Sequence, residues 1–466
     1  MSTDPKTSGW RFARAFWTAN AVELLERAAW YGVFVAITLY LSRILGFTDI
    51  EAAVTSGVFS AGLYLLPVFS GALADKIGFK RALLIAFALL SIGYAGMWAL
   101  PTLLQNAGLA SYGKKAVLTG LAQTSYRWLF IPMMLVVMVG GSFIKSVITA
   151  TVAKETTPDT RARGYSIFYA MVNVGAFSGK TIVKPLRLAM GDNGFVVLNL
   201  FAASMTALAF VLVLLLYKSG VREEAQKTLG EVWRALVAVC RRGRLILLTV
   251  IITGFWMVQH QMYATMPKYV LRLAGEGASP SWYANVNPAT VVIFVGPVTQ
   301  FMKRFSALAS MTVGMFIMPL SAMAMASGNF FSGDTPMLGM HPVALMMVIG
   351  IGLQGFAECF ISPRYLEYFS LQAPKGEEGL YLGFSHLHSF LSSILGFSLS
   401  GVLLDRYCPP RKKFATTAAW RAAVAQAHVI WLVFVGISAL SAFALIAYGV
   451  ITKRADARSG QATKDG

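Results

Sequence analysis

The sequence is dominated by apolar stretches that are each long enough to cross a bilayer. A transmembrane helix needs about 20 apolar residues to span about 30 Å of hydrocarbon. Stretches of this kind cover approximately residues 18–44, 52–74, 82–100, 128–152, 164–188, 195–216, 245–270, 283–302, 307–326, 342–369, 379–404 and 425–448. Only 13% of the 466 residues are charged and the mean hydropathy is +0.61, which excludes a soluble protein. We therefore expect an all-α polytopic membrane protein with 12 transmembrane helices.

A charged segment divides these stretches into two six-helix halves. We expect a cytoplasmic N-terminal arm (1–17), a first bundle (18–217), a linker (218–244), a second bundle (245–452) and a cytoplasmic tail (453–466). The linker has the charge pattern of a helix on the membrane surface. The net charge of +19 arises largely in short connecting segments, so we exclude a nucleic-acid partner.

The distribution of Lys and Arg predicts the orientation in the membrane. These residues are more frequent in the segments that face the cytoplasm when both termini are inside, as the positive-inside rule requires. The basic segment 405–421 is the main exception. We expect a multi-pass protein of the cell membrane, which is the cytoplasmic (inner) membrane if the source is bacterial.

The connection after the second stretch contains a recognisable motif. It reads Gly71-Ala-Leu-Ala-Asp75-Lys-Ile-Gly78-Phe-Lys80-Arg81. Small residues allow helices to approach closely, and a carboxylate beside cations can lock and release two helix ends. The motif resembles the signature loop of the major facilitator superfamily, which implies a major facilitator fold and a gating role for Asp75, Lys80 and Arg81. An ordinary basic loop would explain the charges but not the two glycines.

The first stretch carries three charges on one helix face. Glu23, Glu26 and Arg27 are separated by three and four residues, and Trp30 and Tyr31 extend the same face. Arg27 lies about 14 Å along the helix from Thr18, near the middle of the bilayer. A charge there costs about 2.5–3.5 kcal/mol unless it is paired or hydrated. This predicts a polar cavity, with a purely structural ion cluster as the alternative.

Charges in other stretches complete a site between the two halves. Lys145 lies in the fourth stretch, and Glu358 lies in the tenth, where Pro363 permits a bend. Arg27 and Lys145 would attract a carboxylate, and Glu358 would attract an ammonium group. The arrangement predicts a transporter for a small zwitterionic solute.

Several motifs together resemble the proton-coupled oligopeptide transporter (POT) family. Glu23-Leu-Leu-Glu26-Arg27-Ala-Ala-Trp30-Tyr31-Gly32 resembles the ExxER(F)xYYG motif of that family. The further matches are Lys145 after a glycine pair, Phe168 to Gly175 with Asn173, Phe255-Trp256 followed by Gln261, Trp282 to Pro288 with Asn287, and Glu358 through Ser362-Pro363 to Gln372-Ala373-Pro374. The resemblance covers most of the chain.

The resemblance implies a role for each matching residue. Arg27, Lys145, Asn173, Asn287 and Glu358 would hold the termini and backbone of a di- or tripeptide, while Tyr31 and Tyr64 would line the pocket. Glu23 and Glu26 would couple proton movement to alternating access. The energy source would be the proton gradient without a cofactor, and the protein would function as a monomer in the lipid bilayer.

The sequence also departs from the family pattern. Ser146-Val147 stands where the family usually has Pro-Asn, Trp30 replaces a tyrosine, and His260 replaces a glutamate of the seventh helix. The two extra helices of many bacterial members are absent. His260 is either a hydrogen-bonded interior residue or a protonatable gate.

A basic stripe in the fifth stretch is not explained by the resemblance. Lys180, Lys184 and Arg187 share a helix face with Asn173 and run from the predicted site toward the outer surface. We expect Lys180 to contact the solute and to tune its preferred charge. Interfacial snorkelling is the alternative.

Other chemistry finds little support. Cys240, Cys359 and Cys408 lack metal-binding spacing, and His386 and His388 are expected on opposite sides of one helix, so no metal site is predicted. No enzyme constellation is present. The leading hypothesis is proton-coupled symport of short peptides, and the alternatives are an organic-anion transporter and, with less support, a transporter-like solute sensor.

Overall fold

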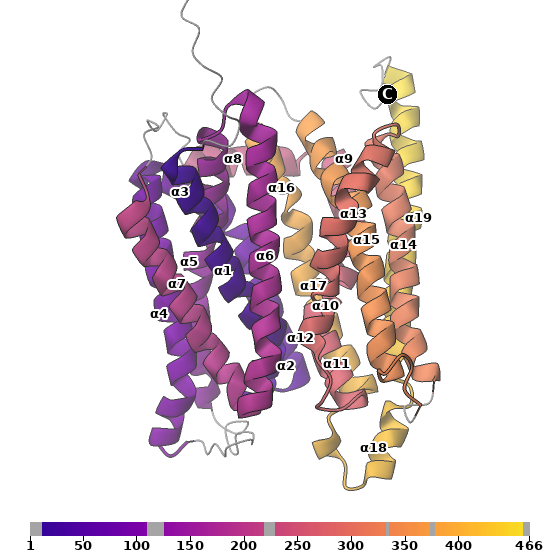
Figure 1. Cartoon of the computed structure of the whole chain (residues 1–466). Coiled ribbons are helices and arrows are strands. Elements are labelled where there is room, and N and C mark those ends of the chain that lie inside the picture. Colours follow the sequence, from indigo (N-terminus) through magenta and orange to yellow (C-terminus); the bar gives the residue numbers. More distant parts are fainter. Residues whose placement is uncertain (1–11, 110–124, 219–228, 332–334, 373–377, 460–466) are drawn as a thin grey trace, which may run out of the picture.

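The computed structural model shows two helical bundles side by side (Figure 1). It describes residues 12–109, 125–218, 229–331, 335–372 and 378–459. The first bundle contains α1 (Arg14–Leu39), α2 (Asp49–Leu65), α3 (Pro67–Ile77), α4 (Phe79–Asn106), α5 (Phe130–Lys154), α6 (Pro158–Met190) and α7 (Asn193–Leu216). The second contains α9 (Gly243–Gln259), α10 (Gln261–Ala264), α11 (Met266–Leu273), α12 (Pro280–Tyr283), α13 (Val286–Met302), α14 (Ala307–Ser327), α15 (Pro342–Leu371), α16 (Glu378–Ser385), α17 (Leu387–Tyr407), α18 (Thr417–Val424) and α19 (Val429–Ser459).

The described helices match the predicted membrane spans. Nine segments within the described residues are long and apolar enough to cross a membrane. The other predicted spans correspond to α2 with α3, to α6 and to α12 with α13. The predicted class, an all-α polytopic membrane protein with two helical halves, is therefore confirmed.

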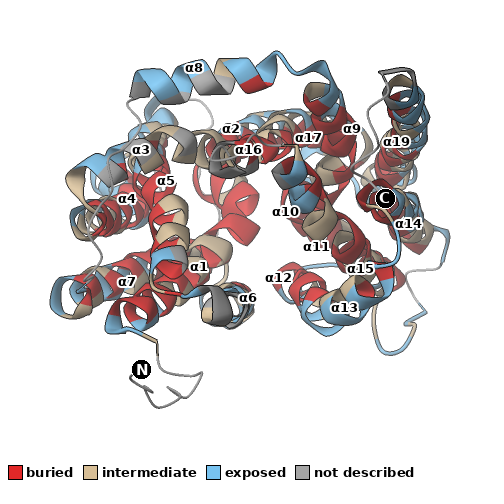
Figure 2. Cartoon of the chain, turned by 90° about the horizontal axis from the view of Figure 1, so that it is seen from above, coloured by how far each residue is buried: buried red, intermediate tan, exposed pale blue. Residues whose placement is uncertain are grey.

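The segment between the bundles forms a helix outside them. Helix α8 (Leu229–Cys240) lies across one end of the spans (Figures 1 and 2). Helix α1 begins and α19 ends at this same end of the molecule (Figure 1). The part of the predicted linker at residues 219–228 lies outside the described residues, and the exact domain bounds stay a prediction.

Several spans are interrupted where the sequence predicted continuous helices. The second span breaks at Leu66, because Pro67 lacks an N–H and begins a new helix. The seventh breaks at His260 and again at Thr265, and the eleventh breaks at His386. Non-helical backbone at membrane depth is tolerated only inside the protein or along a cavity. The breaks at His260 and His386 therefore mark the region between the halves.

Glycines bring α1 and α6 into backbone contact. A Cβ atom on Gly179 would lie 2.2 Å from the Ala28 carbonyl oxygen, and one on Gly175 would lie 2.5 Å from that of Leu24. Small residues at helix interfaces allow this close approach in membranes. The contact fixes the faces that α1 and α6 present to the second bundle.

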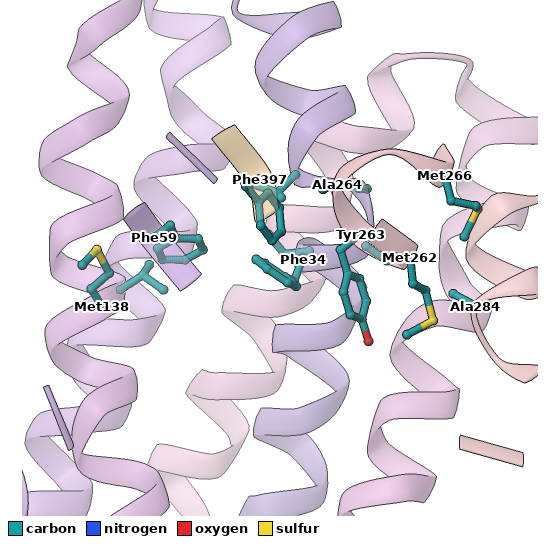
Figure 3. Packing of buried hydrophobic residues seen from close by; sticks show 14 of the residues in the cluster. Phe34, Phe59, Met138, Met262, Tyr263, Ala264, Met266, Ala284 and Phe397 are labelled. Atoms are coloured by element: carbon teal, nitrogen blue, oxygen red, sulfur yellow. The ribbon is translucent and has the colours of Figure 1, made fainter. Parts of the chain in front are cut away.

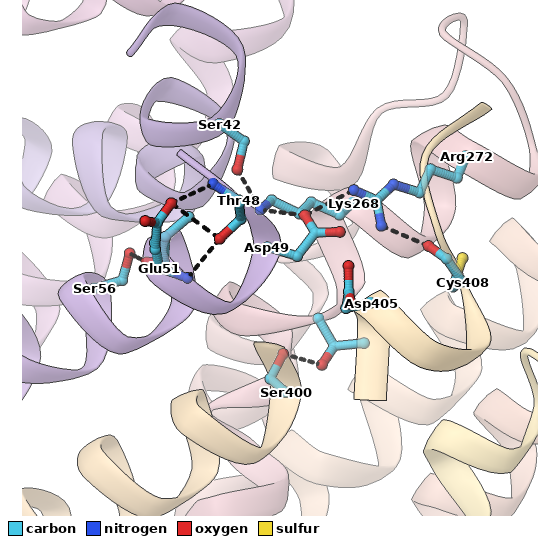
Figure 4. Close-up of polar contacts among 12 residues, drawn as sticks. Ser42, Thr48, Asp49, Glu51, Ser56, Lys268, Arg272, Ser400, Asp405 and Cys408 are labelled. Atoms are coloured by element: carbon cyan, nitrogen blue, oxygen red, sulfur yellow. Dashed lines mark hydrogen bonds and ion pairs between the residues drawn. The ribbon is translucent and has the colours of Figure 1, made fainter. Parts of the chain in front are cut away.

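The halves are joined by ion pairs at the end opposite α8. Asp49, at the start of α2, pairs at 2.8 Å with both Lys268 and Arg272 of α11 (Figure 4). Lys268 also donates to Ser42 Oγ, and Arg272 donates to the carbonyl oxygen of Cys408. Asp49 and Lys268 are buried. This cluster therefore closes the interface at the end opposite α8.

A second set of ion pairs centres on Glu276, which lies in the segment between α11 and α12. Glu276 pairs with Arg43 at 2.6 Å and with Arg187 of α6 at 2.9 Å, and Arg43 also pairs with Asp192. Burial raises the pKa of the Glu276 carboxyl, but its hydrogen bonds and the positive charges of Arg43 and Arg187 lower that pKa below its usual value. Glu276 thus stays ionised, and the ion pairs stay formed, at mildly acidic pH.

Aromatic side chains form the next layer inward. Phe34 of α1 lies between Tyr263 of α10 and Phe397 of α17, with ring centroids 5.1 and 5.9 Å away (Figure 3). On the first-half side, Trp30 stacks on Phe34 and contacts Phe59. These rings pack the two halves against each other between the ion pairs and the middle of α1.

The backbone contact of α1 with α6 predicts a stability effect. Gly179→Ala places a methyl group against the Ala28 carbonyl, and overpacking of this kind costs about 1–3 kcal/mol. We expect a lower melting temperature in detergent. The matched control is Gly436→Ala in α19, where an added Cβ meets nothing within 4 Å. Equal melting temperatures for the two variants would contradict the contact.

The ion-pair cluster around Asp49 predicts a change in accessibility. Asp49→Asn leaves two buried cations without a carboxylate, which costs the closed state about 3–5 kcal/mol. Cys408 is buried beside this cluster and serves as a reporter. With Cys240 and Cys359 changed to serine, we expect maleimide labelling of Cys408 in detergent to accelerate about tenfold or more. The control is Asp405→Asn, whose carboxylate pairs with Lys413 at the surface; equal acceleration there would rule out a specific role for Asp49.

Candidate substrate and proton site

The three charges of α1 form one compact cluster. Arg27 Nε lies 3.0 Å from Glu23 Oε1, and Arg27 Nη2 lies 2.5 Å from Glu26 Oε2. Both carboxylates are buried, and Glu23 Oε2 has no hydrogen-bond partner among the described residues. One guanidinium thus serves two carboxylates, so a proton on either acid would relieve a buried negative charge.

Lys145 of α5 lies near this cluster and beside an aromatic ring. Its Nζ atom lies 5.1 Å from the centre of the Tyr64 ring. Glu23, Glu26 and Arg27 are within electrostatic range of this ammonium group. The structure therefore brings Lys145 toward the α1 charges, and its contact with a solute stays a prediction.

Tyr64 connects the first half with the broken spans of the second. Its ring is nearly parallel to those of His260 and His386, with centroids 6.4 and 6.5 Å away. His260 lies at the break between α9 and α10, and its Nδ1 atom is 3.3 Å from Ser392 Oγ. It is thus a buried, hydrogen-bonded residue that also contacts the predicted pocket.

His386 and His388 do not lie apart as predicted. The helix is interrupted at His386, and the rings of His386 and His388 come within 6.4 Å of each other. His388 also lies 5.1 Å from the ring of Trp256. The expectation of opposite faces was wrong because it assumed an unbroken helix through both residues.

Glu358 of α15 is held by two amides of the second half. Gln259 Nε2 donates to Glu358 Oε2 at 2.9 Å, and Asn287 Nδ2 donates to the same oxygen at 3.3 Å. Within the described residues, Oε1 receives no hydrogen bond. The sequence did not lead us to predict Gln259 as a site residue, although its polar side chain within an apolar stretch was an available signal. The arrangement leaves one carboxylate oxygen for a cationic ligand.

Asn173 and Tyr31 occupy less direct positions. Asn173 is half-buried, and its amide donates to the Tyr169 carbonyl of its own helix at 2.8 Å. Tyr31 lies beside Tyr263 across the interface, with ring centroids 6.4 Å apart. Tyr31 therefore contacts the closed layer, and a ligand contact of either residue stays a prediction.

The basic stripe of α6 contacts the second half. Lys180 Nζ donates to the Ala284 carbonyl at 3.2 Å, and Lys184 Nζ lies 4.3 Å from the Trp282 ring. Arg187 pairs with Glu276. Lys180 is only 1% exposed, so interfacial snorkelling does not describe it. The stripe is part of the contact between the halves in this conformation.

The predicted gating loop lies near the α8 end. Helix α3 ends at Ile77, and Gly78 has a φ of 91°, a conformation that favours glycine. Lys80 Nζ donates to the Leu214 carbonyl at 3.0 Å, and Arg81 is exposed. The side chain of Asp75 lies outside what the structure describes. The gating role of Asp75, Lys80 and Arg81 stays a prediction.

Comparisons with known proteins agree with the overall fold. The family model of the Major Facilitator Superfamily matches residues 21–338. Multidrug resistance protein MdtH of Yersinia pestis is 24% identical over 386 residues, which cover 82% of this chain and 84% of that protein.

Solved structures of peptide transporters share the fold. A proton dependent oligopeptide transporter has a TM-score of 0.70 and 19% identity, covering 94% of this chain and 99% of that one. The tetrameric PepTSo2 structure has a TM-score of 0.68 and 18% identity, covering 95% and 99%. The family model spans more than half of the sequence, from α1 of the first half to the segment after α14 of the second. The chain therefore belongs to the Major Facilitator Superfamily and is a multi-pass membrane transport protein rather than an enzyme.

Proposed function

We propose that the chain is a proton-coupled symporter of short peptides, a divergent member of the POT family. The observation that carries the proposal is the presence of opposite charges on the two halves. The cations Arg27 and Lys145 lie on the first half, and the carboxylate of Glu358 lies on the second. A peptide has a carboxylate and an ammonium group at its two ends, which complement these charges. Peptide transporters with this fold were crystallised with sulfate and with alafosfalin.

The cycle would use the interface between the halves. The ion pairs at Asp49 and Glu276 close one end, and their separation would open it while the α8 end closes. With the α8 end placed in the cytoplasm, the present conformation is closed to the outside. A peptide that bridges Arg27 and Glu358 would draw the halves together around itself.

Glu23 and Glu26 are the proposed proton carriers beside Arg27. A proton on one carboxylate weakens its pairing with Arg27, which then becomes available for the peptide carboxylate. His260 is the second candidate, since it lies beside Tyr64 at a helix break. All these groups come from a single chain, so each monomer would hold a complete site.

An organic anion is the second candidate substrate. Lys180 places an additional cation near the site, where Glu358 is within electrostatic range of it. Cations beside a cavity with apolar walls raise the local concentration of anions. A non-peptide organic anion would use Arg27 and Lys145 without an ammonium group at Glu358, whereas an acidic peptide would keep its own ammonium group there and add further negative charge.

Uptake into proteoliposomes tests the proposed function. We expect radiolabelled dialanine to accumulate when the outside is more acidic, and the accumulation to collapse when an uncoupler is added. The Glu358→Gln variant should lower uptake about tenfold or more, because it removes the charge that attracts the peptide ammonium. Uptake that is insensitive to both the pH gradient and the uncoupler would refute symport, and uptake of anions but not of dialanine would favour the second candidate.

A comparison of proton-driven uptake with substrate exchange tests the role of the α1 carboxylates. Glu23→Gln and Glu26→Gln each keep the side-chain size but remove a titratable group. We expect proton-driven uptake to fall at least about tenfold, while exchange of labelled for unlabelled dialanine falls by less than about threefold. If both variants accumulate dialanine like the wild type, the carboxylates are not the proton site and His260 becomes the better candidate.

A further inference from the structure

Lys180 is a buried amine to which the proposed cycle of peptide symport gives no role. Its Nζ atom donates to the Ala284 carbonyl and lies 5.1 and 5.4 Å from the ring centres of Tyr31 and Tyr263. These partners come from α1, from α10 and from the end of α12, so both halves enclose the side chain. The enclosure exists because the outer end is closed.

A comparison with Lys268 shows what Lys180 lacks. Lys268 is buried to a similar degree but has the Asp49 carboxylate at 2.8 Å and the Ser42 hydroxyl as partners. Within the described residues, Lys180 has no carboxylate within ion-pair distance. A buried ammonium group without a carboxylate is costly, and a carbonyl with two aromatic faces offsets only part of that cost. The closed conformation therefore favours the neutral amine of Lys180.

The titratable groups around Lys180 are few. Helix α1 presents Tyr31 with Arg27 one turn further in, α10 presents Tyr263, and α12 contains Tyr283 next to the Ala284 carbonyl. Helices α5 and α6 contribute the cations Lys145 and Lys184, and α15 contributes Glu358. Helices α7 and α13, which also pack against α6, contain no titratable residue. Glu358 is the carboxylate that acts on Lys180, and it is engaged with Gln259 and Asn287.

Opening of the outer end would change this environment. Two hydrogen bonds beside Lys180 also join α6 to α12 and the residues after it. The Trp282 indole donates to the Thr181 carbonyl, and the Asn285 amide donates to Thr181 Oγ1. When these separate, Lys180 loses the Ala284 carbonyl and the ring of Tyr263, and water reaches the amine. Hydration favours the ammonium form. The two conformations of the transporter thus favour two protonation states of one side chain.

We infer that Lys180 is a proton-carrying residue of the transport cycle, in addition to the carboxylates of α1. Nζ takes a proton from water when the outer end is open. The ammonium group releases that proton to water of the central cavity as α6 and α12 close, and the neutral amine keeps an N–H for the Ala284 carbonyl. The inference rests on the proposed symport, because it assigns one of its protons.

The test counts protons and substrate together in proteoliposomes. A pH-sensitive dye and radiolabelled dialanine report the two fluxes for the wild type, Lys180→Met, Lys180→Gln and Lys180→Arg. We expect the Met and Gln variants to move one proton fewer per dialanine and to keep exchange within about threefold of the wild type. Arginine does not release its proton, so Lys180→Arg should lower net uptake and exchange about tenfold or more. Lys184→Gln is the matched control on the same helix face and should keep the wild-type proton count.

The outcomes separate this inference from the proposed function. If the wild type moves no protons with dialanine, the proposed symport fails. If the wild type does so and both neutral variants keep its proton count, the inference alone fails. A loss of acidic dipeptide uptake with an unchanged proton count would likewise overturn it, because Lys180 would then read solute charge. Since Gln can still donate to Ala284, a folded Gln variant keeps the test decisive if the Met variant does not fold.

Discussion

Burial of charge between two apolar bundles is the constraint on which this structure depends. A charge at membrane depth needs a counter-charge, water or a polar partner. Within the site these partners lie in the same half, but at the end opposite α8 they come from across the interface. The buried Asp49 neutralises two cations of α11, and Glu276, whose side chain is 63% exposed, pairs with two arginines of the first half. The halves are therefore held by contacts that are strong when closed and costly when only partly broken. Such contacts favour two discrete conformations over a continuum of intermediate ones.

The order of residues along α1 shows how this closure reaches the site. From Arg43, α1 and its π-helical end run inward past Phe34 and Tyr31 to Arg27, at about 1.5 Å per residue. Arg43 pairs with an acid of the second half, and Phe34 contacts two aromatic rings of that half. Arg27 pairs with two carboxylates of α1 itself. The backbone contact at Gly179 ties α6 to this helix, so Lys180 and Arg187 move with it. A change of charge on the carboxylates beside Arg27 and a change of contact at the end opposite α8 are thus connected through one rigid pair of helices.

The sequence predicted the class of fold and the main charges of the site, because both depend on local patterns. Apolar stretches of bilayer length predict spans, and the offsets of Glu23, Glu26 and Arg27 place them on one helix face. The breaks at His260 and His386 were not predicted, since neither position has the proline that marks Leu66. For the same reason the closeness of His386 and His388 was missed. The partners of Lys180 and Asp49 could not be predicted either, because they lie more than 80 residues away in the chain and come together only in the assembled interface.

The charges near the site also bear on the energy that drives transport. Glu23, Glu26 and Glu358 are formally balanced by Arg27, Lys145 and Lys180, so an empty site with every group ionised has no net charge. In the proposed symport, a zwitterionic peptide would not alter this balance, whereas each accompanying proton would add one positive charge. The membrane potential acts only on net charge moved across the bilayer, at about 2.3 kcal/mol per charge for 100 mV. If Lys180 is neutral in the closed conformation, the empty site carries one negative charge there and the bound proton cancels it. The potential would then assist the return of the empty carrier, and the inward step with substrate would depend more on the proton concentration gradient.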